Sequence, residues 1–326
     1  MRDSYSVKFS GFKLVNSKIF KRNYSDLCQS LKLHPYYVTG FCDGESSFII
    51  SIRPNSKIKT GWSVELIFEI CLHKKDLELL KLIQQALGGV GNISKHSDKS
   101  IQLKVGSVKD LELIVNHFDK YPLITQKCAD YFLFKQALEL VKNKKHLTLE
   151  GIQNLINIKA SVNLGLSDKL KVAFPNTVPV SRPLINEEIK DSNWLSGFIS
   201  AEGCFLIVIN PSKSNKIGSV VSLWFQITQH SRDEKLLKSF ISYLGCGRYT
   251  PHSNRNAGNF IVQKFSDLDE KIIPFLKKYS ILGIKALDFS DFCEVGELIK
   301  NKAHLTTTGL EQILTIKKRM NNNRIN

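Results

Sequence analysis

The sequence lacks the patterns that mark several large classes of enzyme and membrane protein. Its 326 residues contain no P-loop, no GxSxG motif and no HExxH motif, so those nucleotide-binding, hydrolase and zinc-protease chemistries are not indicated. No apolar run approaches the ~20 residues that a membrane-spanning helix needs. The seven cysteines include no CxxC pair, which argues against a zinc ribbon or a disulfide framework and favours free thiols.

Acidic residues are scarce relative to basic ones. The chain has 46 Lys and Arg against 30 Asp and Glu, which gives a formal charge of +16 and a pI of about 9.4. Such an excess predicts a polyanionic partner, either nucleic acid or an acidic membrane surface. A hydrophobic content of 42% indicates a globular protein, and the length is enough for two domains with their own cores.

One short segment occurs twice in the chain. Residues 36–46 read YYVTGFCDGES and residues 193–203 read NWLSGFISAEG, so Glu45 corresponds to Glu202 at a shift of 157 (202 − 45). Each copy is an apolar run with helical character that ends in a single carboxylate beside a small residue. A repeated helix with a repeated terminal acid suggests one active site built from two halves.

The repeat extends over almost the whole chain, with a shift of 157 that becomes 158 further on. The matching landmarks are His73 and His230, Gly88 and Gly245, Tyr121 and Tyr279, and His146 and His304. This spacing indicates a duplicated domain rather than a short-period solenoid. We therefore predict a basic N-terminal arm of unassigned role (1–34), a first domain (35–164), a linker (165–190) and a second domain (191–326).

Within each half the hydrophobic periodicity predicts one helix, then strands, then helices. The first helices are expected at 35–45 and 192–202, with Pro35 in a first turn and Asp191 or Ser192 as an N-cap. Strict alternation at 63–72 and 220–228 predicts antiparallel strands with one apolar face. The other expected strands are 48–54 and 205–211, with shorter ones near 91–105 and 247–264. The other expected helices are 75–87, 109–119, 127–143 and 149–160, then 232–244, 268–278, 285–300 and 307–319. The predicted fold class is α+β.

The outward faces of these strands carry mixed polar side chains, which suit the reading of base edges while Lys and Arg hold phosphates. A merely solvated sheet face is the alternative for any single strand. The duplication and the charge favour two sheets forming a DNA-binding saddle. The candidate DNA-contacting residues are Ser51, Arg53, Asn55, Lys57, Ser63, Glu65, Glu69, Ser94, His96, Gln102, Lys104, Asn210, Ser212, Lys213, Ser222, Trp224, Gln226, Thr228, Arg248, Thr250, Asn259 and Gln263.

Small residues four apart precede each repeated acid, and this spacing lets two helix backbones approach closely. They are Gly40 and Gly44 in the first copy, and Gly197 and Ala201 in the second. Packed side by side, the helices would bring Glu45 and Glu202 together at two C-termini, where the helix dipole and mutual repulsion disfavour anions. A divalent cation such as Mg²⁺ would offset that cost and could support phosphodiester hydrolysis. Two solvated glutamates are the alternative.

Further candidate catalytic residues are less specific. Lys127 and Lys285 match at a shift of 158 (285 − 127) and could stabilise a charged transition state or position water. Gln229 is expected to follow an outward-facing strand, where it could orient a water, whereas its repeat partner Leu72 could not. The predicted site is therefore asymmetric at that position.

The segments GFCDGES and GFISAEG resemble the LAGLIDADG motif, and the chain as a whole resembles a single-chain LAGLIDADG homing endonuclease, or meganuclease. The segments HFDKYPLITQK, NKKHLT, YLGCG and QITQH are similar to the monomeric group encoded in fungal mitochondrial introns. The resemblance covers about residues 35–320. One such motif is short, but two motifs at this separation inside a full-length duplication make the resemblance to this family highly specific.

The resemblance implies two pseudo-symmetric αββαββα domains whose sheets straddle double-stranded DNA, in a monomer without a membrane partner. It implies hydrolysis of both strands at a long asymmetric target, with short 3′ overhangs. Two or three Mg²⁺ ions would be shared between the domains. Their implied ligands are Glu45, Glu202 and the carbonyls of Gly44 and Ala201. No role is assigned to Asp43 or Ser200. The implied location is the mitochondrion.

Two other functions are compatible with this resemblance. Related proteins act as maturases, which bind intron RNA and assist splicing, and others retain DNA binding without cleavage. Loss of either acid would have favoured these alternatives, and both Glu45 and Glu202 are present.

Overall fold

The structure is a computed structural model that describes residues 32–324. Of the predicted N-terminal arm, only residues 32–34 lie within this range. The first half contains α2 (Pro35–Glu45), β1 (Ser46–Pro54), β2 (Trp62–His73), η1 (Lys74–Asp76), α3 (Leu77–Ala86), β3 (Asn92–Lys95), β4 (Ser100–Val105), α4 (Val108–Lys120), α5 (Lys127–Lys142), η2 (Lys145–Leu147) and α6 (Leu149–Lys159).

A connecting segment with one short helix, α7 (Asp168–Ala173), leads into a second half of the same plan. The second half contains α8 (Ser192–Glu202), β5 (Gly203–Pro211), β6 (Ser219–His230), η3 (Ser231–Asp233), α9 (Glu234–Leu244), β7 (Arg248–Pro251), β8 (Ala257–Val262), α10 (Phe265–Asp267), η4 (Leu268–Ile272), α11 (Ile273–Lys278), α12 (Ile284–Lys300), η5 (Ala303–Leu305), α13 (Thr307–Lys318) and η6 (Asn321–Asn323).

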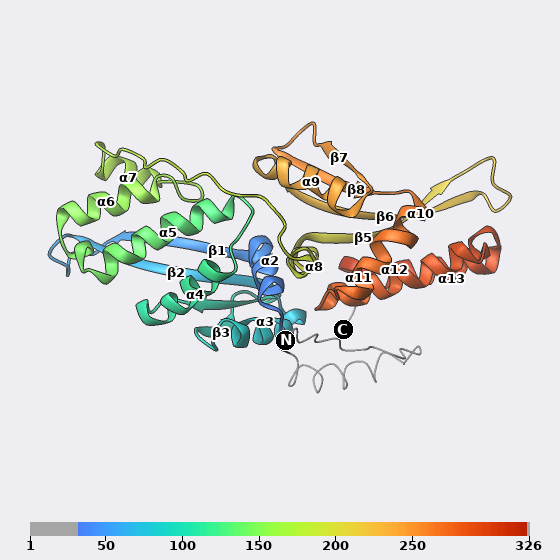
Figure 1. Cartoon of the computed structure of the whole chain (residues 1–326), viewed down its shortest axis with the longest axis horizontal. Coiled ribbons are helices and arrows are strands. Elements are labelled where there is room, and N and C mark those ends of the chain that lie inside the picture. The colour runs from blue at the N-terminus through green and yellow to red at the C-terminus, as the bar shows by residue number, and fades with distance from the viewer. Residues whose placement is uncertain (1–31, 325–326) are drawn as a thin grey trace, which may run out of the picture. The chain divides into compact units, whose positions relative to one another are not determined.

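Each half is built on a four-stranded antiparallel sheet. The strand orders are β1-β2-β4-β3 and β5-β6-β8-β7, so the two sheets have the same topology. In Figure 1 the sheets lie on opposite sides of α2 and α8, which pack side by side between them. The predicted α+β class with two antiparallel sheets is confirmed.

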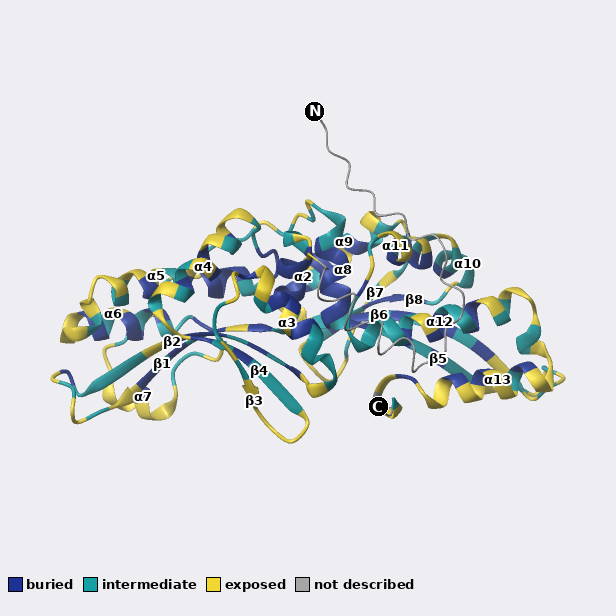
Figure 2. Ribbon diagram, turned by 90° about the horizontal axis from the view of Figure 1, so that it is seen from below, coloured by how far each residue is buried: buried dark blue, intermediate teal, exposed yellow. Residues whose placement is uncertain are grey.

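Aromatic side chains fill the space between each sheet and its helices. The ring of Phe48 packs against Phe68 and Phe134 at centroid distances of 5.4 and 5.3 Å. Its repeat partner Phe205 packs against Phe225 and Phe292 at 5.4 and 5.3 Å. Replacing a buried Phe of this kind by Ala costs about 3–5 kcal/mol. Figure 2 shows buried residues in α2 and α8 and along the strands, while the β3–β4 turn is exposed.

The expected elements are all present, with small differences at their ends. Both first strands begin two residues earlier than predicted, at Ser46 and Gly203, because each motif helix passes directly into its strand. The helices expected at 75–87 and 232–244 each begin with a short 3₁₀ turn. In those turns the repeated histidines, His73 and His230, act as N-caps by accepting backbone hydrogen bonds. Within residues 32–324, no helix has the length and apolar character required to cross a membrane.

Candidate active site at the interface between the halves

The motif helices α2 and α8 approach so closely that only glycine fits at two positions. A Cβ atom added to Gly40 would lie 1.9 Å from the carbonyl oxygen of Trp194. One added to Gly197 would lie 2.0 Å from the carbonyl oxygen of Tyr37. The predicted small-residue packing therefore occurs, and backbone meets backbone along the seam between the halves.

The two repeated acids end these helices side by side. Glu45 is the last residue of α2 and Glu202 the last of α8. A Cβ atom added to Gly44 would lie 2.4 Å from the Ala201 Cβ and 3.3 Å from the Glu202 Oε1. Burial, and then the negative charge of Glu202, raise the pKa of Glu45 to about 7. The sequence prediction that these acids form one destabilised anionic site is consistent with this geometry.

Both candidate lysines reach this site. The Lys127 ammonium donates hydrogen bonds of 2.9 Å to the carbonyl oxygens of Cys42 and Gly44. The Lys285 ammonium donates one of 2.6 Å to the carbonyl oxygen of Ala201. Burial lowers the pKa of both lysines, and the nearby carboxylates partly oppose this effect. Each lysine thus contacts a carbonyl that the sequence comparison implied as a metal ligand.

The donor set at this site fits a hard divalent cation. Glu45 and Glu202 supply carboxylate oxygens, and Gly44 and Ala201 supply carbonyl oxygens whose second lone pair remains after the lysine hydrogen bond. Within residues 32–324, no group of three or more His, Cys, Asp and Glu side chains could hold a metal on its own. The two carboxylates and two carbonyl oxygens suit Mg²⁺, which binds one or two carboxylates together with waters and substrate phosphates.

Asp43 and Ser200, which had no predicted role, hold the backbone just before each lysine. The carboxylate of Asp43 accepts hydrogen bonds from the amides of Ile124 and Thr125, at 3.0 and 3.2 Å, and from the Trp194 indole across the interface, at 2.7 Å. In the second half the Ser200 hydroxyl accepts a bond of 3.2 Å from the amide of Leu282. The two positions are therefore structural, with the charged one buried among donors that satisfy it.

Two further aspartates lie beside the site and were not predicted from the sequence. Asp76 accepts a hydrogen bond from the amide of Ile284, and Asp233 accepts one from the amide of Gln126, both at 2.7 Å and both across the interface. A signal was present, because the pattern His-x-x-Asp recurs at 73–76 and 230–233 with the same shift of 157. Its meaning depended on contacts between distant segments, which spacing alone does not reveal.

Gln229 lies elsewhere than predicted. It is inside β6 opposite Gly258, rather than after the strand. Its place in the alternation matches that of the buried Phe225 and Ile227, while Thr228 is on the other face. A role for Gln229 in orienting water remains a prediction.

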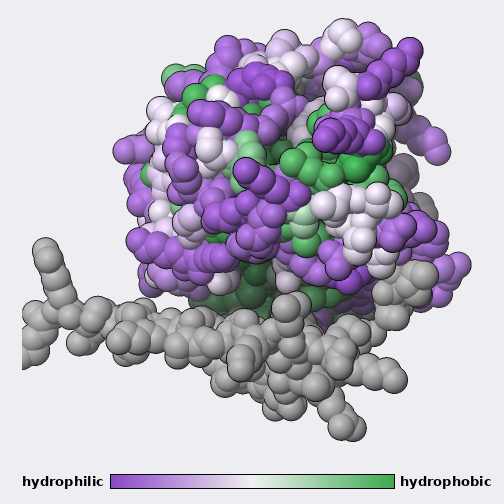
Figure 3. Space-filling model, turned by 90° about the vertical axis from the view of Figure 1, so that its right-hand side faces the viewer, coloured by the Kyte–Doolittle hydropathy of each residue, from purple (hydrophilic) through white to green (hydrophobic). Residues whose placement is uncertain are grey.

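The register places the predicted polar residues on one face of each sheet. On the first sheet, this face contains Ser51, Arg53, Ser63, Glu65, Glu69, Ser94, Gln102 and Lys104. On the second sheet, it contains Asn210, Ser222, Trp224, Gln226, Thr228, Arg248, Thr250 and Asn259. Asn55, Lys57, His96, Ser212, Lys213 and Gln263 lie in the segments just beyond the strands. Figure 3 views one end of the molecule, where hydrophilic residues surround a smaller hydrophobic area.

Several polar side chains on these faces bond to each other. Lys104 pairs with Glu65 at 2.8 Å, and Thr228 donates to Asn259 at 2.8 Å. An exposed ion pair such as Lys104–Glu65 contributes ~1 kcal/mol or less, so a ligand can replace it at small cost. The second sheet also has apolar positions on this face that sequence reasoning did not list, including Leu206 opposite Trp224.

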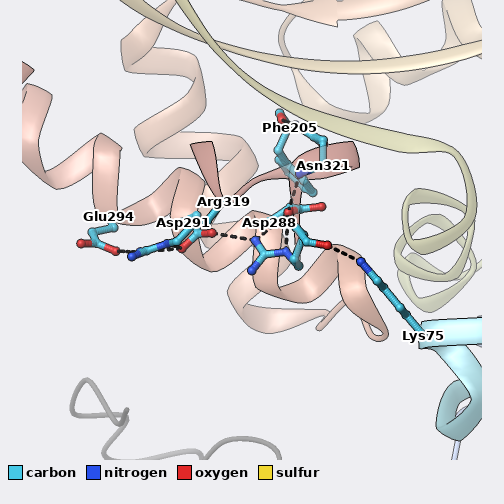
Figure 4. Close-up of polar contacts among 8 residues, drawn as sticks. Lys75, Phe205, Asp288, Asp291, Glu294, Arg319 and Asn321 are labelled. Atoms are coloured by element: carbon cyan, nitrogen blue, oxygen red, sulfur yellow. Dashed lines mark hydrogen bonds and ion pairs between the residues drawn. The ribbon is translucent and has the colours of Figure 1, made fainter. Parts of the chain in front are cut away.

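A charged cluster secures the helix that carries Lys285. Asp288 and Asp291 of α12 accept hydrogen bonds from Arg324 and Arg319, with Arg324 at 2.6 Å from both carboxylates. Figure 4 shows Lys75 of the first half extending toward this cluster, where it donates to the carbonyl oxygen of Arg324. The helix that carries Lys127 has a similar ion pair, in which Arg182 contacts Asp130 of α5 at 2.6 Å. Both lysine-bearing helices are thus anchored by buried aspartates.

These features define a class: a duplicated α+β protein with one acidic site on the seam and a polar sheet face in each half. The family model for LAGLIDADG endonuclease matches the chain twice, at residues 38–138 and 195–296. The chain belongs to the LAGLIDADG endonuclease family.

Similar proteins support the same assignment. The chain is 42% identical over 297 residues to "Probable intron-encoded endonuclease 3" of Neurospora crassa, covering 90% of this chain and 56% of that protein. It is 39% identical to "Probable intron-encoded endonuclease 2" of the same organism, covering 92% of this chain and 70% of that protein. The chain thus spans little more than half of the first relative.

Solved structures of LAGLIDADG endonucleases share the fold over nearly their full length. The I-SmaMI homing endonuclease bound to cleaved DNA has a TM-score of 0.89 and 45% identity, covering 90% of this chain and 99% of that one. The I-CpaMI meganuclease bound to uncleaved DNA has a TM-score of 0.85 and 46% identity, covering 89% and 99%. I-SmaMI has also been solved on its uncleaved target in the presence of calcium ions.

Proposed function

We propose that this chain is a site-specific DNA endonuclease that hydrolyses one phosphodiester bond in each strand of a long asymmetric target and leaves short 3′ overhangs. The observation that carries the proposal is the pair of acids at the seam. Glu45 and Glu202 end two helices in backbone contact, so charges of the same sign from the two halves converge at one place. A duplex whose two strands are related by an approximate twofold axis suits a site with the same symmetry.

Mg²⁺ is the proposed cofactor, in two or three ions shared between the halves. Glu45, Glu202 and the carbonyl oxygens of Gly44 and Ala201 would hold it. When bound, the metal lowers the pKa of a water and stabilises the leaving oxygen of the phosphodiester. The raised pKa of Glu45 supports the proposal, because a buried anion beside another anion gains the most from a cation.

The lysines contribute positive charge at fixed points beside the acids. The ammonium groups of Lys127 and Lys285 are held by carbonyl oxygens of the two motif helices, so they are oriented before substrate arrives. In that position they would stabilise negative charge on the phosphate or hold a water by hydrogen bonding. Their partial burial strengthens such an interaction, because less bulk water screens it.

The polar sheet faces would bind the duplex on either side of the site. Their mixed donors and acceptors suit base edges in the major groove, and the net charge of +16 suits phosphates. The two faces differ in sequence at most matching positions, such as Glu65 and Ser222, which fits an asymmetric target. We propose that one chain acts as a monomer, with domains at 35–164 and 191–326, and that it is a mitochondrial protein.

Cleavage of target DNA tests this function directly. The substrate is a DNA duplex with the sequence into which the intron carrying this gene is inserted, without the intron itself. The duplex is incubated with the protein, with and without Mg²⁺. We expect cuts in both strands only with the metal, at a site that a scrambled duplex of equal length does not share. Failure to cut this duplex, together with tight binding to intron RNA, would instead indicate a maturase.

A further inference from the structure

The N-cap residue of each lysine-bearing helix leaves the first turn without a side-chain cap, although in α5 the Lys127 amide donates to the Thr125 hydroxyl at 3.2 Å. The N-cap residue of α5 is Gln126 and that of α12 is Gly283, and neither supplies a side-chain cap hydrogen bond. Uncapped first-turn amides are unsatisfied donors, and a helix end without an acceptor frays. Lys127 is the first residue of α5 and Lys285 the second of α12, so fraying would move these two side chains directly.

In both helices, an aspartate of the opposite half accepts a hydrogen bond from a backbone amide at the start of the helix. Asp233, in η3 of the second half, accepts a hydrogen bond of 2.7 Å from the amide of Gln126 in the first. Asp76, in η1 of the first half, accepts one of 2.7 Å from the amide of Ile284 in the second. The donors correspond at a shift of 158 (284 − 126) and the acceptors at 157 (233 − 76), so the crossed arrangement is repeated.

The approach of Asp76 also depends on a glycine. A Cβ atom added to Gly283 would lie 2.5 Å from the Asp76 Oδ1, and its φ of +75° is one that other residues rarely adopt. Each lysine-bearing segment is also held from its own half, by Asp43 or by Ser200. The start of each helix is therefore fixed from both sides of the seam.

We propose that Asp76 and Asp233 are positioning residues, each holding in place the active-site lysine of the opposite half. The proposal rests on the function proposed above for Lys127 and Lys285. It makes lysine placement depend on contact between the halves, so a lysine is fully positioned only when the seam is closed. Asp233 is buried and Asp76 is half-buried, so water competes little for either hydrogen bond.

Lysine reactivity measures the positioning without any need for DNA cleavage. The metal-free, DNA-free protein is pulsed with acetic anhydride, and acetylation at each lysine is read by peptide mass spectrometry. We expect D233A to raise labelling of Lys127 severalfold while Lys285 stays unchanged, and D76A to do the reverse. G283A, which displaces the carboxylate of Asp76, should resemble D76A. The crossed pattern distinguishes positioning from a general loss of stability.

Two sets of variants act as controls. D76N and D233N keep an acceptor oxygen and should label nearly as the parent protein does. S107A removes a side-chain cap from α4, which carries no active-site lysine, and should change neither lysine. Equal changes at both lysines, a change only in the lysine of the same half, or alanine and asparagine variants that behave alike would overturn the proposal.

Cleavage then links positioning to activity. For D76A and D233A we expect a single-turnover rate lowered by roughly 10- to 100-fold, because small misplacements of a catalytic group have effects of this size. Binding to uncut DNA in Ca²⁺ should change little, since neither aspartate is on the polar sheet faces. If each alanine variant changes labelling of the lysine in the opposite half but cleaves DNA at the parent rate, the aspartates position the lysines but this positioning does not matter for catalysis. A parent protein that cuts no DNA, yet shows crossed labelling, would refute only the proposed function.

Discussion

At the scale of single residues, Glu45 combines burial with a neighbouring like charge, and both raise its pKa to about 7. An acid whose pKa is higher in the folded than in the unfolded state favours folding when protonated. The metal-free protein should therefore lose stability as pH rises from about 4.5, the ordinary value, to about 7. A bound cation would offset this electrostatic cost, because its charge is opposite to that of the two carboxylates.

Glu45→Gln removes this titration. At pH 8 without divalent metal, we expect the variant to be more stable than the parent by about 1–3 kcal/mol, from a shift worth ~1.4 kcal/mol per pKa unit. Below pH 4.5 the difference should disappear, because the parent carboxyl is then protonated in both states. Urea unfolding across this pH range measures the effect, with E188Q at an exposed position as the control. A parent that is the more stable at pH 8 would contradict the argument.

At the scale of elements, the contact between α2 and α8 determines where the acids lie. Gly40→Ala would place a Cβ atom 1.9 Å from the carbonyl oxygen of Trp194, which forces the helix backbones apart. We expect a destabilisation of about 1–3 kcal/mol, as for overpacked cores. Cleavage should fall as well, because separating the helices separates Glu45 from Glu202.

Gly106→Ala is the matched control, because its added Cβ atom would meet only the carbonyl oxygen of Leu66 at 3.7 Å. Thermal unfolding and cleavage rate should both stay close to the parent values. If G40A matched this control in both measurements, the close backbone contact would not be what holds the acids together.

The helices and strands were predictable from the sequence because the same hydrophobic pattern occurs in both halves of the chain. The alternation at 63–72 and 220–228 and the helical runs that end in Glu45 and Glu202 could each be checked against the other copy. The convergence of the acids followed from the glycine spacing, since small residues on one helix face allow close packing. The crossed caps of Asp76 and Asp233 could not be read this way, because periodicity within an element carries no information about contacts between halves.

At the scale of the whole molecule, duplication gives two similar sheets, and divergence makes their polar faces different. Trp224 and Gln226 face the same side as Glu69 does in the other half, so the two faces offer different groups to a duplex. The net charge of +16 on the whole chain favours binding to phosphates without selecting a sequence. Under the proposed function, specificity would come from the sheets and catalysis from the seam.

The central claim is that one site, shared by both halves, cuts both strands. The most direct measurement follows each strand of a doubly labelled target during cleavage by E45Q and by E202Q in Mg²⁺. We predict that either substitution lowers cutting of both strands by about 10²-fold or more, the scale for losing a principal electrostatic group, while target binding in Ca²⁺ is retained. A variant that still cuts both strands at the parent rate, or one strand normally, would contradict the shared site.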